Sequence, residues 1–131
     1  CAKLLNTVVN LFVNNLPVPR KSQSSIHPVG FYCLRRKDGD EIIDWNLTSR
    51  EIFNFVRAIC TPGPCARTIL NDSELKINEV QLINNAAKYK GIPGEILNIA
   101  YDGVIVRTGD SMIKIVDYES EVKLKVGLRL G

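Results

Sequence analysis

Two adjacent arginines stand before an acidic turn, and their types and spacing suggest anion chemistry. Arg35 and Arg36 each carry a guanidinium group that can bind a phosphate or a carboxylate through two parallel hydrogen bonds. The alternative is that both pair with Asp38, Asp40 or Glu41 at the surface, where ion pairs contribute little free energy. The residue types alone favour the surface pairs, and they leave an anion contact open.

Trp45 is the only tryptophan, and it lies in an Asp-Trp-Asn step that leads into a helical pattern. Its ring is predicted either to anchor the helix against a core, with the indole N–H bonded nearby, or to stack on a base or a pterin. The residue types favour the anchor. Arg57, on the polar edge of the same helix, is predicted either to bridge to Asp44 or to reach a ligand.

The usual catalytic and metal-binding patterns are not found. His27 is the only histidine, so no Ser-His-Asp or Cys-His set can form, and neither a Walker loop, a GxGxxG run nor an HExxH motif is present. The four cysteines contain no CxxC pair, which argues against zinc, and their apolar neighbours favour reduced thiols. Reduced thiols lead us to expect a cytoplasmic protein. No apolar run is long enough to span a bilayer.

The charge is unevenly distributed. Residues 1–60 hold 8 Lys/Arg against 5 Asp/Glu, whereas residues 61–131 hold 9 of each. The second half therefore lacks the positive excess that nucleic-acid binding faces usually show. Cys1 stands where an initiator Met would be, so we expect the chain to be a piece of a longer polypeptide.

Two helices are predicted. Apolar residues recur at helical spacing over residues 2–14, whereas residues 16–30 are rich in proline and polar residues and are predicted to be a linker. A capping box at Thr48 and Glu51 predicts a helix over about 48–60, which must end before Pro62.

From residue 65 onward the spacing of apolar residues changes from a helical to a strand-like period. We expect strands over residues 66–70, 75–83, 95–100, 104–108, 112–118 and 122–126, with a hairpin at Asp102-Gly103. A short strand is also expected over residues 31–34, and a second short strand or an extended piece over residues 41–45. The sequence thus predicts an α+β fold, mainly β, with a small closed or half-closed antiparallel barrel over about residues 65–126.

Three segments in order resemble the formyltransferase family. They are IIDWNLTSREIFNFVRAICTPGPCA at residues 42–66, PGEILNIAYDGVIVRTGDSMIKI at 93–115 and VGLRLG at 126–131. The Leu-rich first helix and Gln23 resemble the end of the family's catalytic domain and its linker. Cys65 stands where the family usually has glycine, so the local turn is expected to differ.

The resemblance implies an organisation in three parts. Residues 1–15 would be the last helix of a catalytic domain, residues 16–30 a linker, and residues 31–131 an OB-like C-terminal domain. The family transfers a formyl group from formyltetrahydrofolate to a primary amine, using an Asn-His-Asp trio of the N-terminal domain. That trio is absent here, so we expect the fragment alone to be inactive and its partner to be the N-terminal catalytic domain, which would bind the cofactor.

The acceptor is predicted from the arginine pair. In the amino-sugar branch of the family two arginines precede an acidic turn and an acid-Trp pair, whereas the methionyl-tRNA branch commonly has a lone lysine. This spacing favours an amino sugar nucleotide slightly over methionyl-tRNA. The residues expected to bind the acceptor are Arg35, Arg36, Trp45 and Arg57.

Two alternatives stay open. The domain could be an accessory module that binds tRNA through basic residues of the second half, or a purely structural domain that supports dimerisation. The basic residues concerned are Lys88, Lys90, Lys123, Lys125 and Arg129.

Overall fold

The computed structural model describes all residues from Cys1 to Gly131. The chain divides into two compact units, Cys1–Arg35 and Arg36–Gly131. No helix is long and apolar enough to cross a membrane.

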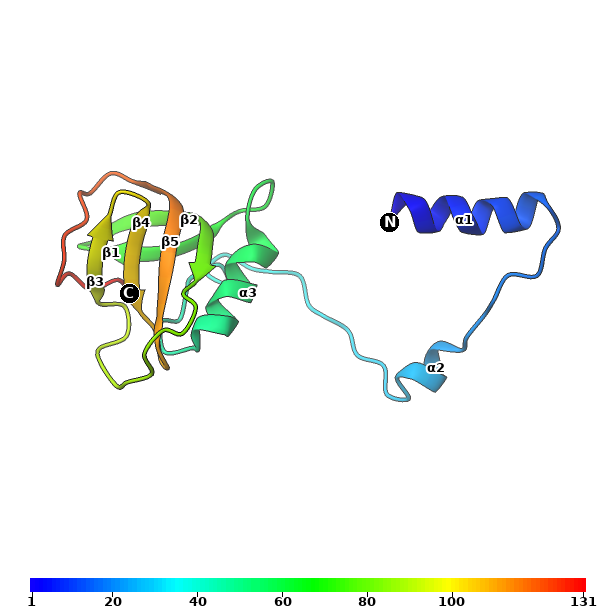
Figure 1. Cartoon of the computed structure of the whole chain (residues 1–131), viewed down its shortest axis with the longest axis horizontal. Helices are drawn as coiled ribbons and strands as arrows, with labels where there is room; N and C mark the ends of the chain where they lie inside the picture. The colour runs from blue at the N-terminus through cyan, green and yellow to red at the C-terminus, as the bar shows by residue number, and fades with distance from the viewer. The chain divides into compact units, whose positions relative to one another are not determined.

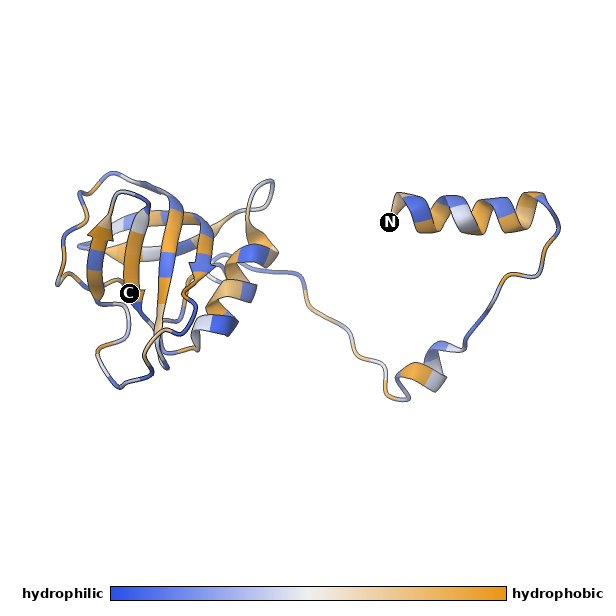
Figure 2. Ribbon diagram, viewed as in Figure 1, coloured by the Kyte–Doolittle hydropathy of each residue, from blue (hydrophilic) through white to orange (hydrophobic).

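The first unit holds α1 (Ala2–Val13) and the short α2 (Gln23–Ile26). No residue of α1 is buried, although apolar residues make up much of it (Figure 2). The helix gives way to Asn15 in the left-handed conformation, at φ +52°, as its asparagines predict. Besides the two predicted helices, a single helical turn forms within residues 16–30, which we expected to be a linker.

The second unit is an antiparallel sheet with one helix, α3 (Ser49–Ile59), packed against it (Figure 1). The strand order is β1-β2-β5-β4-β3, and every pairing is antiparallel. The α+β, mainly β fold class is therefore confirmed. The strands are β1 (Ala66–Leu70), β2 (Ser73–Leu82), β3 (Ile96–Ala100), β4 (Gly103–Arg107) and β5 (Met112–Ser120).

The helix α3 begins with the predicted capping box. The Thr48 hydroxyl accepts from the amide of Glu51, whose carboxylate accepts from the amide of Thr48. Its apolar stripe, Ile52, Val56 and Ile59, is buried in the core. Apolar side chains that point inward from the strands complete that core.

The C-terminal tail closes the sheet. The amide of Ile96 donates to Leu128 and that of Leu130 to Gly94, so the tail pairs with the outer edge of β3. The amide of Gly131 then donates to Ile69 of β1, on the opposite edge of the sheet. The closing element is thus the tail. The predicted strands at 31–34 and 122–126 do not form, because neither segment pairs with a neighbouring strand.

Candidate functional site

Trp45 lies in the core at the point where the barrel closes. Its side chain is buried, with 3% of the residue exposed, and its Nε1 donates to the Thr68 hydroxyl across 2.9 Å. The ring lies beside Gly94 and Gly131, so it contacts the start of β3 and the end of the tail. This geometry is that of a packing anchor, because no face of the ring is open for a ligand to stack on.

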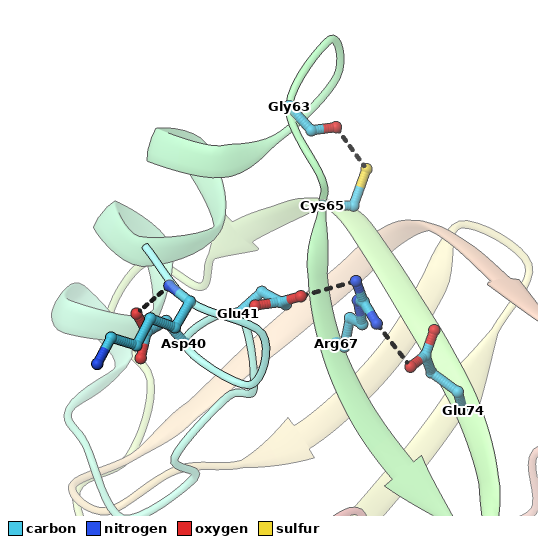
Figure 3. A network of polar contacts seen from close by, with 7 residues as sticks. Asp40, Glu41, Gly63, Cys65, Arg67 and Glu74 are labelled. Atoms are coloured by element: carbon cyan, nitrogen blue, oxygen red, sulfur yellow. Dashed lines mark hydrogen bonds and ion pairs between the residues drawn. The ribbon is translucent and has the colours of Figure 1, made fainter. Parts of the chain in front are cut away.

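An ion-pair network holds the segment before Trp45 on the edge of β1 (Figure 3). Arg67 donates from Nη2 to Glu41 across 2.7 Å and from Nη1 to Glu74 across 3.1 Å. The backbones pair as well, since the amide of Arg67 donates to Glu41 and the amide of Ile43 donates to Arg67. Hydrogen bonding to Glu74 raises the pKa of the Arg67 guanidinium. The network fixes where the chain enters the barrel.

The arginine pair lies at the junction of the two units, and both side chains are exposed. Glu41 is paired with Arg67, and Asp40 accepts from the amide of Lys37. No ion pair of the structure includes Arg35 or Arg36. Their guanidinium groups are therefore available to an anion.

Arg57 lies in the last turn of α3 and does not reach Asp44, which instead accepts from the amide and the side chain of Asn46. Its guanidinium lies 5.5 Å from the centre of the Phe53 ring. Both residues line a cleft of about 230 Å³ between α3 and β2. The cleft is small for a ligand, so Arg57 is placed at a shallow surface. The structure thus leaves Trp45 in the core and does not gather the four predicted residues into one pocket.

A second polar cluster ties the start of α3 to the turn between β4 and β5. The Asp110 carboxylate accepts from the amide of Ser49 across 2.8 Å, and the hydroxyls of Ser49 and Thr108 bond across 2.8 Å. The carboxylate lies at the positive end of the helix dipole, where a negative charge is stabilising. The amide of Ser49 is the main cause that lowers the pKa of Asp110, and the hydroxyls add to it.

Replacing Asp110 by asparagine should therefore destabilise the domain in a pH-dependent way. A carboxyl group whose pKa is lowered on folding stabilises the folded state above its unfolded pKa, near 3.8, and loses that contribution as the pH falls through the folded value. We expect D110N to lower the free energy of unfolding by about 1 kcal/mol at neutral pH and by less in acid. Urea titrations at several pH values measure this difference. D72N is the matched control, and an equal loss in both variants would contradict the role of Asp110.

The two ends of the barrel differ in charge. Leu82 pairs with Ile113 and Leu75 with Ser120, so the loop after β2 and the loop after β5 leave the sheet at opposite ends. Lys88 and Lys90 lie in the first loop, and the Nε of Arg129 donates to Pro93 at the same end. An open hollow at the opposite end is lined mostly by acidic and polar residues, including Asp72, Glu74, Glu119 and Glu121. The basic residues proposed from the sequence thus form two groups, with only Lys123 and Lys125 in the loop after β5.

Sequence reasoning missed Asp110 and Arg107 as residues with defined polar roles. Asp110 sits within a Thr-Gly-Asp turn, and only the fold shows that this turn meets α3. Arg107 ends a strand of alternating apolar residues, and its complete burial depends on a distant loop. No group of three or more potential metal ligands comes together.

These features define the class of the domain. It is a small OB-like barrel, made of five antiparallel strands, closed by its tail and capped by one helix.

The chain belongs to the family described as formyl transferase, C-terminal domain, whose model matches residues 36–129. This match confirms the resemblance seen in the sequence. The methionyl-tRNA formyltransferase of Mycoplasma capricolum is 36% identical over 70% of this chain and 29% of its own length. The enzyme of the same name from Citrifermentans bemidjiense is 32% identical over 95% of this chain and 37% of its own length. The chain thus spans about a third of these relatives.

A solved structure shares the fold. A variant of HypX from Aquifex aeolicus superimposes with a TM-score of 0.57 over 91% of this chain and 20% of the HypX chain, at 18% identity. At that identity the likeness concerns the fold alone.

Proposed function

We propose that this chain is the C-terminal part of a formyltransferase that transfers a formyl group from formyltetrahydrofolate to the amino group of methionyl-tRNA. The observation that carries the proposal is the family match over residues 36–129. The relatives described above are methionyl-tRNA formyltransferases, and this supports the acceptor. The slight preference for an amino sugar nucleotide finds no support in these relatives.

The catalytic steps and the binding of formyltetrahydrofolate would belong to an N-terminal domain. Six large apolar residues of α1 are exposed, and a helix with such a face needs a partner to pack against. We assign residues 1–15 to the surface of that domain and residues 16–30 to the connection. The apolar residues are Leu4, Leu5, Val8, Val9, Phe12 and Val13.

The barrel would hold the acceptor through its basic end. Lys88, Lys90 and Arg129 can contact phosphates of the RNA backbone, which release counterions when they are neutralised. The acidic residues at the opposite end repel phosphate, so the charge difference would orient the RNA on the domain. Arg35 and Arg36, which are free of ion pairs, would contact the acceptor near the junction with the catalytic domain.

The charge difference between the two ends can be tested by tRNA binding. We expect the K88A/K90A double variant to weaken binding and to lower the slope of log K against log salt by about 2, because two phosphate contacts are lost. K123A/K125A removes the same charge at the other end and should change the slope by less than half as much. Filter binding or fluorescence anisotropy over a salt series measures both. Equal slopes for the two variants would overturn the placement of the RNA at the end that carries Lys88 and Lys90. If the unaltered chain did not bind tRNA even at low salt, the proposal of a tRNA acceptor would be wrong.

The arginine pair can be tested in the complete enzyme. We expect R35A/R36A to raise KM for the acceptor about tenfold or more while KM for the formyl donor is unchanged, because the pair would meet only the acceptor. R20A/K21A, which removes two adjacent positive charges from the first unit, is the control for loss of charge. An unchanged acceptor KM would show that the pair is a solvated surface.

A further inference from the structure

Arg107 is buried on the outer face of the barrel. It ends β4, where Val104 and Val106 point into the core, so the alternation of the strand directs Arg107 away from it. A residue in that position is normally exposed, yet only 1% of Arg107 is accessible. The cover is the loop between β2 and β3, whose Gly91 is so close that a Cβ there would lie 2.8 Å from the Arg107 Nε.

The guanidinium of Arg107 has few partners. Its Nη1 donates to the carbonyl of Ser111, and its Cζ lies 4.0 Å from the centre of the Tyr89 ring. Its Nε and Nη2 are buried without a hydrogen-bond acceptor. None of the ion pairs of the structure includes Arg107.

This arrangement is energetically unfavourable for a permanent charge. Taking a guanidinium charge out of water is costly unless a counter-charge and hydrogen bonds compensate it. A desolvated cation–π contact and one hydrogen bond together return only part of that cost. When the loop is closed, Nε and Nη2 of Arg107 therefore lack hydrogen-bond acceptors on one edge of the guanidinium plane.

The cover is attached weakly. Between Asn84 and Gly91 one hydrogen bond joins the loop to the rest of the domain, from the Ser111 hydroxyl to the carbonyl of Ala87 across 3.0 Å. A segment with so few bonds to its surroundings opens at a low free-energy cost. Lys88 and Lys90 flank Tyr89, so the same loop carries two further positive charges.

We propose that Arg107 is the centre of a binding site for a phosphate group, which forms when the loop over residues 84–91 lifts and Tyr89 leaves the guanidinium. The free Nε and Nη2 lie on the edge that makes two parallel hydrogen bonds to an oxyanion, and phosphate oxygens match that spacing. Lys88 and Lys90 add charge around the same group. This site goes beyond the proposed function, because it requires neither the catalytic domain nor methionyl-tRNA.

The closed loop and the phosphate compete for Arg107 in this arrangement, because Gly91 lies against the Nε that the phosphate would use and Tyr89 holds the loop on the guanidinium. The apparent affinity for phosphate is the intrinsic affinity reduced by the fraction of molecules in which the loop is open. Substitutions of Arg107 and of Tyr89 should then change the affinity for phosphate in opposite directions. Arg107→Met removes the site, whereas Tyr89→Ala weakens the cover and should tighten phosphate binding.

Thermal unfolding of the whole chain in inorganic phosphate, against chloride at equal ionic strength, tests the site. We expect saturating phosphate to raise Tm of the unaltered chain by about 3–6 °C. In R107M the apparent affinity should fall at least about tenfold, because a charge-assisted pair of hydrogen bonds is lost. In Y89A it should rise about threefold or more. Lys125→Ala, which removes one exposed positive charge elsewhere, should behave as the unaltered chain.

A short oligoribonucleotide as a second probe distinguishes the two sources of phosphate. If the oligonucleotide raises Tm at lower concentrations than inorganic phosphate and R107M removes both effects, the group belongs to an RNA backbone. If only inorganic phosphate acts, the site takes a free or terminal phosphate. R107M is expected to fold, because an unbranched apolar side chain can replace a buried cation without loss of stability. A phosphate effect that is absent, or equal in R107M and the unaltered chain, overturns the proposal, whatever the outcome for tRNA.

Discussion

Replacing Trp45 by alanine should lower the free energy of unfolding by about 3–5 kcal/mol, the range for deletion of a large buried aromatic side chain. The ring is 3% exposed and joins three segments that are distant in sequence, namely β1, the start of β3 and the tail. Its loss leaves a cavity where the barrel closes and removes the donor to the Thr68 hydroxyl. Chemical denaturation followed by circular dichroism measures the change, since the variant lacks the only tryptophan fluorophore.

Two controls separate packing from hydrogen bonding. Trp45→Phe keeps most of the apolar contact and loses the indole N–H, so we expect a smaller loss of about 1–3 kcal/mol. Thr68→Val keeps the tryptophan but leaves its N–H without an acceptor, at a cost of about 1–3 kcal/mol. If W45A were no more destabilising than W45F, the anchor interpretation would be wrong.

Replacing Gly94 by alanine should open the barrel. Gly94 has φ +84°, and a Cβ there would lie only 2.1 Å from the backbone oxygen of Leu130. The tail would have to move outward, which breaks the hydrogen bond from Leu130 to Gly94 and exposes the buried Leu130 side chain. We expect a loss of about 3 kcal/mol or more in the free energy of unfolding, from strain and lost burial together.

Gly127 provides a matched control for this prediction. It has the same φ of +84°, but nothing lies within 4 Å of a Cβ placed there. Gly127→Ala should therefore cost only the backbone strain, about 1–2 kcal/mol. The difference between the two variants, taken from urea denaturation curves, measures the close contact with the tail. A difference near zero would mean that the tail does not seal the barrel at Gly94.

Local patterns predicted the elements of the second unit well. The capping box at Thr48 and Glu51 set the start of α3, and Asp102-Gly103 marked the hairpin between β3 and β4, because each signal needs only neighbouring residues. The closing tail was not predicted. Its residues pair with β3 and β1 through backbone hydrogen bonds, and side-chain types do not identify the partner of such a bond.

The candidate site was less predictable than the fold. The residue types favoured Trp45 as a packing anchor, and its enclosed ring agrees with that, whereas its predicted contact with the acceptor stays a prediction. The enclosure itself could not be predicted, because the distance between β1 and the tail cannot be derived from one sequence. Cys65 was expected to alter its turn, yet at φ +63° it has the left-handed conformation that glycine adopts readily. Arg107 could not be singled out, since its burial depends on a loop that lies far from it along the chain.

The position of the closing segment has a consequence for biosynthesis. Residues 127–131 leave the ribosome after every strand, so the nascent domain has its sheet and its tryptophan before it has the piece that joins β3 to β1. Contacts between residues so far apart form late and slowly. During translation the outer edge of β3 thus stays unpaired until residues 127–131 have emerged, and an unpaired strand edge can pair with another chain.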